Sequence, residues 1–405
     1  MTSVASPAAA RLTVRTLRTL AELGAVEAFW RAHAAHPWSD LDYLREVLAA
    51  QPDFLAPHVL VVARGDEVVA LAAGALRRER FPFKVGSFVL LRSRARVLHV
   101  GSGGVMGEDS PEVARALRDE FLAALARGEA DAAYAHQLES GGHLARALAD
   151  VPALQRDRRD RPSAGWRLEL PAGPSEFLAS RSKSTRRHIK RYAQALEREL
   201  GAELAVACHR APEELERLIA DSEAIARQTY HRDLGVGFAD TPELRRLFAF
   251  AAARGWLFGY VLRARGRPIA FWHGLVYRGT FVTRDTGYDP EFTALRPGQY
   301  LLHHVIAEHC TTRASERFDY GVMELDYKKN FGSHRYEKSS PYVFARRPRG
   351  LWLWSLRTLS DALERLARRL LGSRARDLAR RLARLGRKDA AAPGAKVPEP
   401  AEDKE

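Results

Sequence analysis

The chain has 405 residues, 46% of them hydrophobic and 28% charged, and its formal net charge is +14. This length favours two domains with an appendage, and the composition is typical of a globular protein in water. No apolar run approaches the roughly 18 to 20 residues that cross a bilayer, and the N-terminus lacks the pattern of a secretion signal. The two cysteines, Cys208 and Cys310, argue against a disulfide scaffold and fit the reducing cytoplasm, where we expect the protein to reside.

The positive charge is concentrated near the C-terminus. Residues 346–388 hold 14 Lys and Arg side chains against three acidic ones, whereas residues 389–405 are net acidic. The body of the chain is therefore only mildly basic, and its net charge alone does not indicate a nucleic-acid partner.

The first half of the chain predicts a unit of mixed strands and helices. Strands are expected at residues 12–17, 59–63, 68–76, 86–91, 97–100 and 132–138. Between them lie a helical region over residues 20–50, a helix capped by Ser110-Pro111-Glu112 and a short helix at 143–149. A charged, proline-bounded connector at 152–162 ends this half.

The second half repeats this order of elements, without a repeat at the residue level. Helices are expected at 184–200, from 212, from 241 and at 297–310, and strands at 203–208, 257–263, 269–277, 280–286, 318–320 and 341–344. The short turns Arg265-Gly266 and Arg278-Gly279 make three of these strands antiparallel neighbours. Antiparallel strands that feed a helix and then a further strand indicate an α+β fold.

The segment after residue 350 has a different character. Trp352 and Trp354 lead into a leucine-rich amphipathic helix, and Gly372-Ser373 is expected to separate it from a second, arginine-rich helix. Basic amphipathic helices of this kind fit an anionic membrane surface, with docking onto the body or non-specific nucleic-acid contact as the alternatives. Residues 389–405, rich in Ala, Pro and charge, are expected to be disordered.

One stretch of the second half carries most of the functional information. A predicted strand ends in Tyr288-Asp289-Pro290, and the loop Leu295-Arg296-Pro297-Gly298 opens a helix. The strand Phe318-Asp319-Tyr320-Gly321 follows, and then the segment Asp326-Tyr327-Lys328-Lys329-Asn330-Phe331-Gly332. This order resembles the BioF2-like and FemAB-like branch of the GNAT (Gcn5-related N-acetyltransferase) superfamily.

The resemblance implies tandem GNAT-like domains with mixed, mostly antiparallel sheets flanked by helices. It places an N-terminal GNAT-like domain at residues 1–160 and a BioF2-like acetyltransferase domain at residues 161–345. The basic amphipathic helices then occupy residues 346–388, and the tail occupies residues 389–405. The resemblance also implies acyl transfer to an amine or hydroxyl, with acyl-CoA (acetyl-CoA) as co-substrate and no permanently bound cofactor. The expected acceptor is a small molecule or envelope precursor, in cell-envelope or polysaccharide biosynthesis.

The same resemblance assigns acyl-CoA binding to the start of the predicted helix at 297, with Arg296, Gly298, Gln299 and Tyr300. In GNAT enzymes the backbone N–H groups of this turn hold the pyrophosphate, whose charge the helix dipole favours. Arg296 replaces the first glycine of the usual turn; the branch shares this departure, which weakens a specific assignment to acetyl-CoA. Plain helix initiation by Pro297 is the alternative explanation of the tripeptide.

The catalytic residues are also carried over from the resemblance. Lys328, next to Tyr327, occupies the place of a lysine that stabilises the carbonyl oxygen as it gains charge; a solvated surface lysine is the alternative. For the general base we rank Asp319 first, because a carboxylate at a strand end often faces a cleft. The other candidates are Asp285, Asp289, Glu324 and His273.

A basic cluster and two strand residues complete the predicted site. Residues 181–191 hold seven Lys, Arg and His side chains at a helix start, where the dipole disfavours them unless an anion is bound. Arg186 and Arg187 are therefore expected to bind an anionic substrate or a CoA phosphate, with pairing to acidic neighbours as the alternative. Tyr288 and Asp285 are expected to bind substrate as well.

The preferred function is acyl transfer from acyl-CoA. A FemAB-like aminoacyl transfer from charged tRNA is the second hypothesis, although the helical hairpin insertion of many such enzymes is not evident. The third is a non-catalytic protein that keeps the fold while its basic tail binds membrane or RNA. No metal is expected, since His304 and His309 do not share a helix face. No specific nucleic acid is expected either. Peripheral association with the inner face of the membrane is a further hypothesis.

Overall fold

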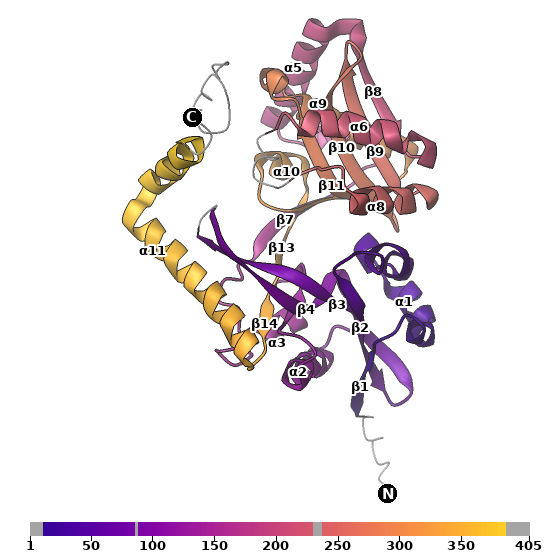
Figure 1. Cartoon of the computed structure of the whole chain (residues 1–405). Helices are drawn as coiled ribbons and strands as arrows, with labels where there is room; N and C mark the ends of the chain where they lie inside the picture. The colour runs from indigo at the N-terminus through magenta and orange to yellow at the C-terminus, as the bar shows by residue number, and fades with distance from the viewer. Residues whose placement is uncertain (1–10, 86–87, 230–236, 386–405) are drawn as a thin grey trace, which may run out of the picture.

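Two β-sheets, each covered by helices, form the body of the protein (Figure 1). The computed structural model describes residues 11–85, 88–229 and 237–385. The first two residues of the strand predicted at 86–91 and the tail at 389–405 lie outside the described residues.

The first sheet has six strands in the order β1-β2-β3-β4-β5-β14. Neighbouring strands are antiparallel except β4 and β5, which run parallel. β3 and β4 form a longer hairpin than the sequence predicts. The strand bounds are β1 Leu12–Leu17, β2 Phe54–Arg64, β3 Glu67–Val85, β4 Phe88–Gly107, β5 Ala132–Ala135 and β14 Tyr342–Phe344.

Helices cover both faces of this sheet, which explains the unbroken apolar run in β2. Leu60 and Val62 point into a core shared with α2 (Pro111–Arg127) and α3 (His143–Ala149), while Val59 and Val61 point into the core around Trp30 on the other face. The helical region predicted over 20–50 is divided, with Pro37 opening its third piece. The pieces are η1 Glu22–Val26, α1 Glu27–His33, η2 Pro37–Ser39 and the π-helical turn η3 Tyr43–Leu48.

The second sheet has eight strands in the order β6-β13-β7-β12-β11-β10-β9-β8. β9 to β11 form the predicted antiparallel meander, which β8 extends at one edge, and β11 pairs with β12 in parallel. The strand β13 was not predicted from the sequence. The bounds are β6 Leu138–Glu139, β7 Ser163–Glu169, β8 Leu204–His209, β9 Leu257–Ala264, β10 Arg267–Tyr277, β11 Thr280–Tyr288, β12 Arg317–Val322 and β13 His334–Ser339.

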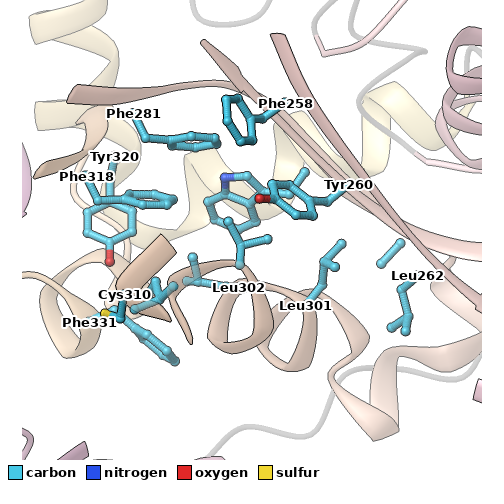
Figure 2. Packing of buried hydrophobic residues seen from close by; sticks show 14 of the residues in the cluster. Phe258, Tyr260, Leu262, Phe281, Leu301, Leu302, Cys310, Phe318, Tyr320 and Phe331 are labelled. Carbon is cyan, nitrogen blue, oxygen red and sulfur yellow. The ribbon is translucent and has the colours of Figure 1, made fainter. Parts of the chain in front are cut away.

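The helix α9 (Pro297–Thr312) packs against one face of this sheet. Leu301 and Leu302 of α9 point toward aromatic side chains of the strands, among them Phe281 and Phe318, whose stacked rings lie 4.4 Å apart (Figure 2). The opposite face is covered by α6 (Leu215–Ala226) and α8 (Pro242–Ala253). The other helical elements of this half are α4 Pro174–Ala179, α5 Lys183–Leu200, η4 Gly201–Glu203, η5 Pro212–Glu214, η6 Pro290–Leu295 and α10 Asp326–Phe331.

The two halves of the chain interlock. β6, from the first half, pairs with β13 in the second sheet, and β14, from the second half, completes the first sheet against β5. A buried hydrogen bond of 2.9 Å, donated by the Tyr277 hydroxyl to Asp40, also joins the halves. The predicted boundary between residues 160 and 161 therefore separates segments of chain that share their sheets.

The helix α11 (Pro348–Leu385) leaves the body as one helix of 38 residues, which continues through Gly372-Ser373, where an interruption was predicted. Its ribbon bends in the second half of the helix (Figure 1). Its first turns pack on the first sheet, where Leu353 is buried beside Phe81 and Phe344. Ion pairs fix the same side of the helix, including a 2.7 Å pair between Arg357 and Asp157.

The outward side of α11 carries an apolar stripe. We give this name to Trp352, Leu359 and Leu366, which recur every seven residues and expose 51%, 50% and 50% of their surface. A seven-residue repeat places the three side chains on one face of the helix. Within the ranges that the structure describes, no helix is long and apolar enough to span a bilayer.

Candidate active site

The parallel strands β11 and β12 separate after a short paired stretch. Only three positions are in register, from Thr280 opposite Arg317 to Val282 opposite Asp319, although β11 continues to Tyr288 and β12 to Val322. Beyond Val282 the backbone of β11 is paired with β10 on one side only. An opening between two strands exposes backbone donors and acceptors that an extended ligand can pair with.

An irregularity in β11 accompanies this separation. The register with β10 shifts between His273 and Gly274, so that Arg284 has no partner of its own in the ladder. Gly274 is required here, because an added Cβ would lie 2.2 Å from the Phe281 ring. The shift presents Arg284, which is paired with Asp285, to a cavity between the two halves.

The start of α9 lies at the end of β11. Arg296 precedes the helix with φ 53° and ψ 48°, the left-handed conformation that favours glycine. The N–H groups of Gln299 and Tyr300 donate back to the Arg296 carbonyl oxygen, and Pro297 has no N–H. Gly298 is therefore the residue of this first turn whose N–H has no acceptor among the described residues, and its Cα faces the Tyr288 ring.

Lys328 lies on α10, beside the opening. Its side chain is buried, with 5% exposed, and its Nζ donates to the carbonyl oxygens of Val322 at 2.8 Å and Gly321 at 3.3 Å. An ammonium group has three N–H donors, so one remains for a further acceptor. Burial lowers the pKa of Lys328 to about 8, and the charge of Asp319 opposes this shift.

The other two predicted catalytic residues lie close to Lys328. Tyr327 packs on the Trp272 ring, and burial raises the pKa of its phenol. Asp319 on β12 accepts hydrogen bonds from the Tyr336 hydroxyl at 2.5 Å, the Gly321 N–H at 2.8 Å and Arg167 at 3.0 Å. Burial by itself would raise the pKa of Asp319, but these donors outweigh it and the pKa is lowered.

Three residues around Asp319 were not singled out from the sequence. The Tyr336 ring has the Arg167 guanidinium 4.6 Å from its centroid and the Lys338 ammonium 5.3 Å from it. The ring lies across Gly165, where an added Cβ would be 2.3 Å away from it. Strand register brings these residues together from β7, β12 and β13, and no short sequence motif contains them.

A cavity of about 330 Å³ lies between the two halves. The first half contributes aromatic and polar residues to its wall, and α8 and β11 close the other side. The polar and aromatic wall residues include Trp38, Tyr43, His99, Ser102, His136 and Arg284. Such a wall suits a polar ligand that stacks on aromatic rings and accepts hydrogen bonds.

The basic cluster forms a separate, open groove at the start of α5. Lys183, Arg187, His188 and Arg191 line a space of about 480 Å³ there. None of these cations has a carboxylate within 4.0 Å among the described residues. Arg186, by contrast, donates to the Ala179 and Arg181 carbonyl oxygens.

The structure thus groups the predicted site residues into four places. Lys328, Tyr327 and Asp319 lie together beside β12, and Arg296, Gly298, Gln299, Tyr300 and Tyr288 lie together at the start of α9. Asp285 pairs with Arg284 at the cavity, and Arg186 and Arg187 lie on α5, which packs against α9. In the described part of the chain, no group of three or more His, Cys, Asp or Glu side chains is placed to hold a metal.

Comparisons with known proteins agree with this geometry. A family model described as an acetyltransferase (GNAT) domain matches residues 183–329. The structure of FemX is similar over 82% of this chain and 98% of FemX, with a TM-score of 0.55 and 11% sequence identity. A tandem GNAT protein from the clavulanic acid biosynthesis pathway matches over 84% of this chain and 99% of its own, with a TM-score of 0.47 and 12% identity. A search of the curated proteins found no match.

Residues 183–329 are thus similar to GNAT domains, and the body of the chain has a fold similar to that of FemX. The match to a GNAT domain model and the fold shared with FemX agree with the resemblance and with the α+β tandem fold predicted from the sequence. GNAT-fold proteins of this kind form a family of acyltransferases.

Proposed function

We propose that the protein transfers an acyl group from acyl-CoA to an amine or hydroxyl. The observation that carries this proposal is the separation of β11 from β12 after three paired positions, with Lys328 buried beside the opening. An extended pantetheine arm can pair with the free edge of β11 and bring its thioester to the Lys328 ammonium.

The proposed reaction is an ordinary acyl substitution. The acceptor nitrogen or oxygen forms a bond to the thioester carbon, the carbon–sulfur bond breaks, CoA leaves as its thiol, and the acceptor loses one proton. The remaining N–H of Lys328 stabilises the thioester carbonyl oxygen, which becomes negative after the acceptor attacks and before the carbon–sulfur bond breaks. Tyr327 supports the wall of the slot beside Lys328.

The role of Asp319 as the general base stays a prediction. Its three accepted hydrogen bonds and its lowered pKa favour a positioning role, in which Asp319 orients Tyr336 and Arg167. The cavity between the two halves, lined by Arg284 beside Asp285, is our candidate for the acceptor site, because β11 borders both the cavity and the opening. A small polar molecule or an envelope precursor fits a wall of this composition.

The donor phosphates would lie near the starts of α9 and α5. Arg296, Gly298, Gln299 and Tyr300 surround the first turn of α9, and the exposed Arg187 on the neighbouring α5 adds positive charge. Arg186 is held by backbone carbonyl oxygens and would contribute mainly long-range attraction.

Titration calorimetry of the full chain with acetyl-CoA, octanoyl-CoA and deacylated tRNA tests the choice of donor. We expect saturable binding of at least one acyl-CoA, and a Lys328→Met protein should bind it with unchanged affinity while its turnover is lost. Binding of tRNA without binding of any acyl-CoA would favour the aminoacyl-transfer alternative, for which FemX is the similar fold. Binding of neither would favour the non-catalytic alternative.

We also propose that the protein works in the cytoplasm at the inner membrane face, with the apolar stripe of α11 against anionic lipid. The stripe is exposed although Leu353 and Leu356 of the same helix are buried, and residues 346–388 carry 14 basic side chains against three acidic ones. Apolar side chains flanked by cations favour the interface of an anionic bilayer.

Vesicle sedimentation tests the membrane proposal with point substitutions. Deleting the whole appendage would also uncover Phe81 and Phe344, so it does not isolate the stripe. A Leu359→Gln/Leu366→Gln protein should lose most of its binding to vesicles in which about one lipid in three is phosphatidylglycerol. A control with Leu20→Gln/Leu55→Gln, which changes two exposed leucines elsewhere, should bind like the unaltered chain. Equal loss in both proteins would remove the proposal.

A further inference from the structure

Where the two halves meet, a cluster of charged side chains contains more cations than the described anions around it neutralise. We call this the seam cluster: Arg167, Asp319, Tyr336 and Lys338 from the second half, with His36 and His136 from the first. Lys338 and Arg167 share one tyrosine ring, at 5.3 Å and 4.6 Å, and one carboxylate, Asp319, lies beside them. That carboxylate pairs with Arg167, at 3.0 Å.

Lys338 is the member of the cluster without an ionic partner. Only 9% of its surface is exposed, and no hydrogen bond or ion pair of its ammonium is found within the described residues. Glu139 lies opposite it in the strand register, but this side chain is exposed and not within 4.0 Å of the ammonium. A buried cation without a close anion is unfavourable, so the arrangement is one that a bound anion would stabilise.

One member of the cluster lines the cavity between the halves. His136 lines that cavity, and its Nδ1 lies 2.8 Å from the Tyr134 hydroxyl. His36 lies beside Gly103, whose left-handed φ of 70° and missing Cβ make room for it. Burial, as the main cause, lowers the pKa of His36 to about 3 and of His136 to about 4, and the positive charge of Lys338 adds to both shifts.

We propose that the seam cluster binds an anionic group of the acceptor, a phosphate or a carboxylate, with Lys338 as its main charge partner. That the bound anion belongs to the acceptor depends on the proposed function, whereas the presence of an anion site does not. Arg167 and the imidazoles of His36 and His136 supply the remaining donors, and Asp319 keeps Arg167 and Tyr336 in place. The acceptor would then be an anionic amine or alcohol, held by its charge next to the thioester slot.

The first test uses the free protein and follows the sign of a stability change. Replacing an unpaired buried cation by an apolar side chain of similar length should not destabilise the chain, whereas removing a paired one should. We therefore expect Lys338→Met to keep or raise the midpoint of thermal unfolding in the absence of ligand. A midpoint well below that of the unaltered chain would overturn the proposal, because Lys338 would then already have its partner.

The second test uses inorganic pyrophosphate and glutarate as probes, without any donor. Because the α5 groove also attracts anions, binding at the seam cluster is followed by the NMR signals of the His36 and His136 imidazole rings. The two signals are assigned with His36→Gln and His136→Gln proteins. At least one probe should shift these signals saturably, and Lys338→Met should weaken that binding at least tenfold. If only pyrophosphate shifts the signals, the anionic group of the acceptor is a phosphate. If only glutarate shifts them, it is a carboxylate.

Arg335→Gln provides the matched control. Arg335 lies on the same strand as Lys338 but on its other face, paired with Glu337 at 2.9 Å. This protein should bind the probes like the unaltered chain. The anion-site proposal would be overturned if Lys338→Met bound the probes as tightly as the unaltered chain. It would also be overturned if neither probe shifted the signals of the two imidazole rings. A failure to bind acyl-CoA would leave these results unaffected, so the two proposals fail separately.

Discussion

At the scale of single residues, Lys328 shows how burial changes the properties of a charged side chain. Its ammonium is 5% exposed, yet two backbone carbonyl oxygens accept its hydrogen bonds and leave one donor unused. The sequence motif located this lysine. It could not distinguish a buried lysine from a solvated one, because the difference depends on where β12 ends and α10 begins.

The titration of Lys328 gives a testable pH dependence. Burial lowers its pKa to about 8, so the positive charge that we propose for oxyanion stabilisation is lost as the pH rises through that value. We expect kcat/KM to fall above about pH 8, by about tenfold for each pH unit. Lys328→Arg, whose guanidinium stays charged, should move the fall to higher pH, which a pH–rate profile of both proteins measures.

The stability of the protein should change in the opposite direction over this range. The unfolded lysine keeps its proton to about pH 10.4, whereas the folded one loses it near 8, so deprotonation relieves the cost of burial between these values. The free energy of unfolding of the unaltered chain should therefore rise there relative to Lys328→Met. A profile with no fall in rate above pH 8 would contradict the role of the ammonium.

At the scale of elements, the order of strands and helices in the second half was predictable. The meander β9 to β11, the helix start at Pro297 and the strand Phe318-Asp319-Tyr320-Gly321 follow from turn residues and apolar runs. The separation of β11 from β12 does not follow from these signals, since local propensity does not encode the distance between parallel strands. β13 was missed because His334–Ser339 is polar and lacks a clear alternation.

The start of α9 supports a prediction that separates function from strain. Arg296 adopts a left-handed conformation, which costs a residue with a Cβ about 1–2 kcal/mol. Arg296→Gly should therefore raise the free energy of unfolding by about 1 kcal/mol, while the KM for acyl-CoA should rise about tenfold if the guanidinium binds a phosphate. Denaturant titration and steady-state kinetics measure the two effects.

The same helix offers the control. Arg313, at the C-terminal end of α9, has a similar left-handed conformation, with φ 53° and ψ 30°. Arg313→Gly should stabilise the chain to a similar extent and leave the KM unchanged. An unchanged KM in Arg296→Gly as well would show that the arginine serves only the turn.

At the scale of the whole molecule, sheet membership and chain order do not coincide. β14 and α11 come last in the described body, yet both pack on the first sheet, where Phe344 and Leu353 join Phe81 and Val97 in one buried cluster. Sequence analysis assigned residues 341–344 to the second half, because an isolated short strand carries no information on its distant partner. Tandem domains were predictable; the exchange of strands between them was not.

This interlocking predicts an unequal response to truncation. A chain that ends after Ser340 loses β14 and α11, so the apolar face of β3 to β5 around Phe81 becomes exposed to water. Hydrogen exchange should then quicken mainly in the first sheet, while β9 to β11, which are buried between α9 and α8, stay protected. A chain that ends after Leu385 keeps both elements and should exchange like the full chain. Equal quickening in both sheets would mean that the halves unfold as one unit. Protection confined to the second sheet would mean that the last strand and helix stabilise the first sheet specifically.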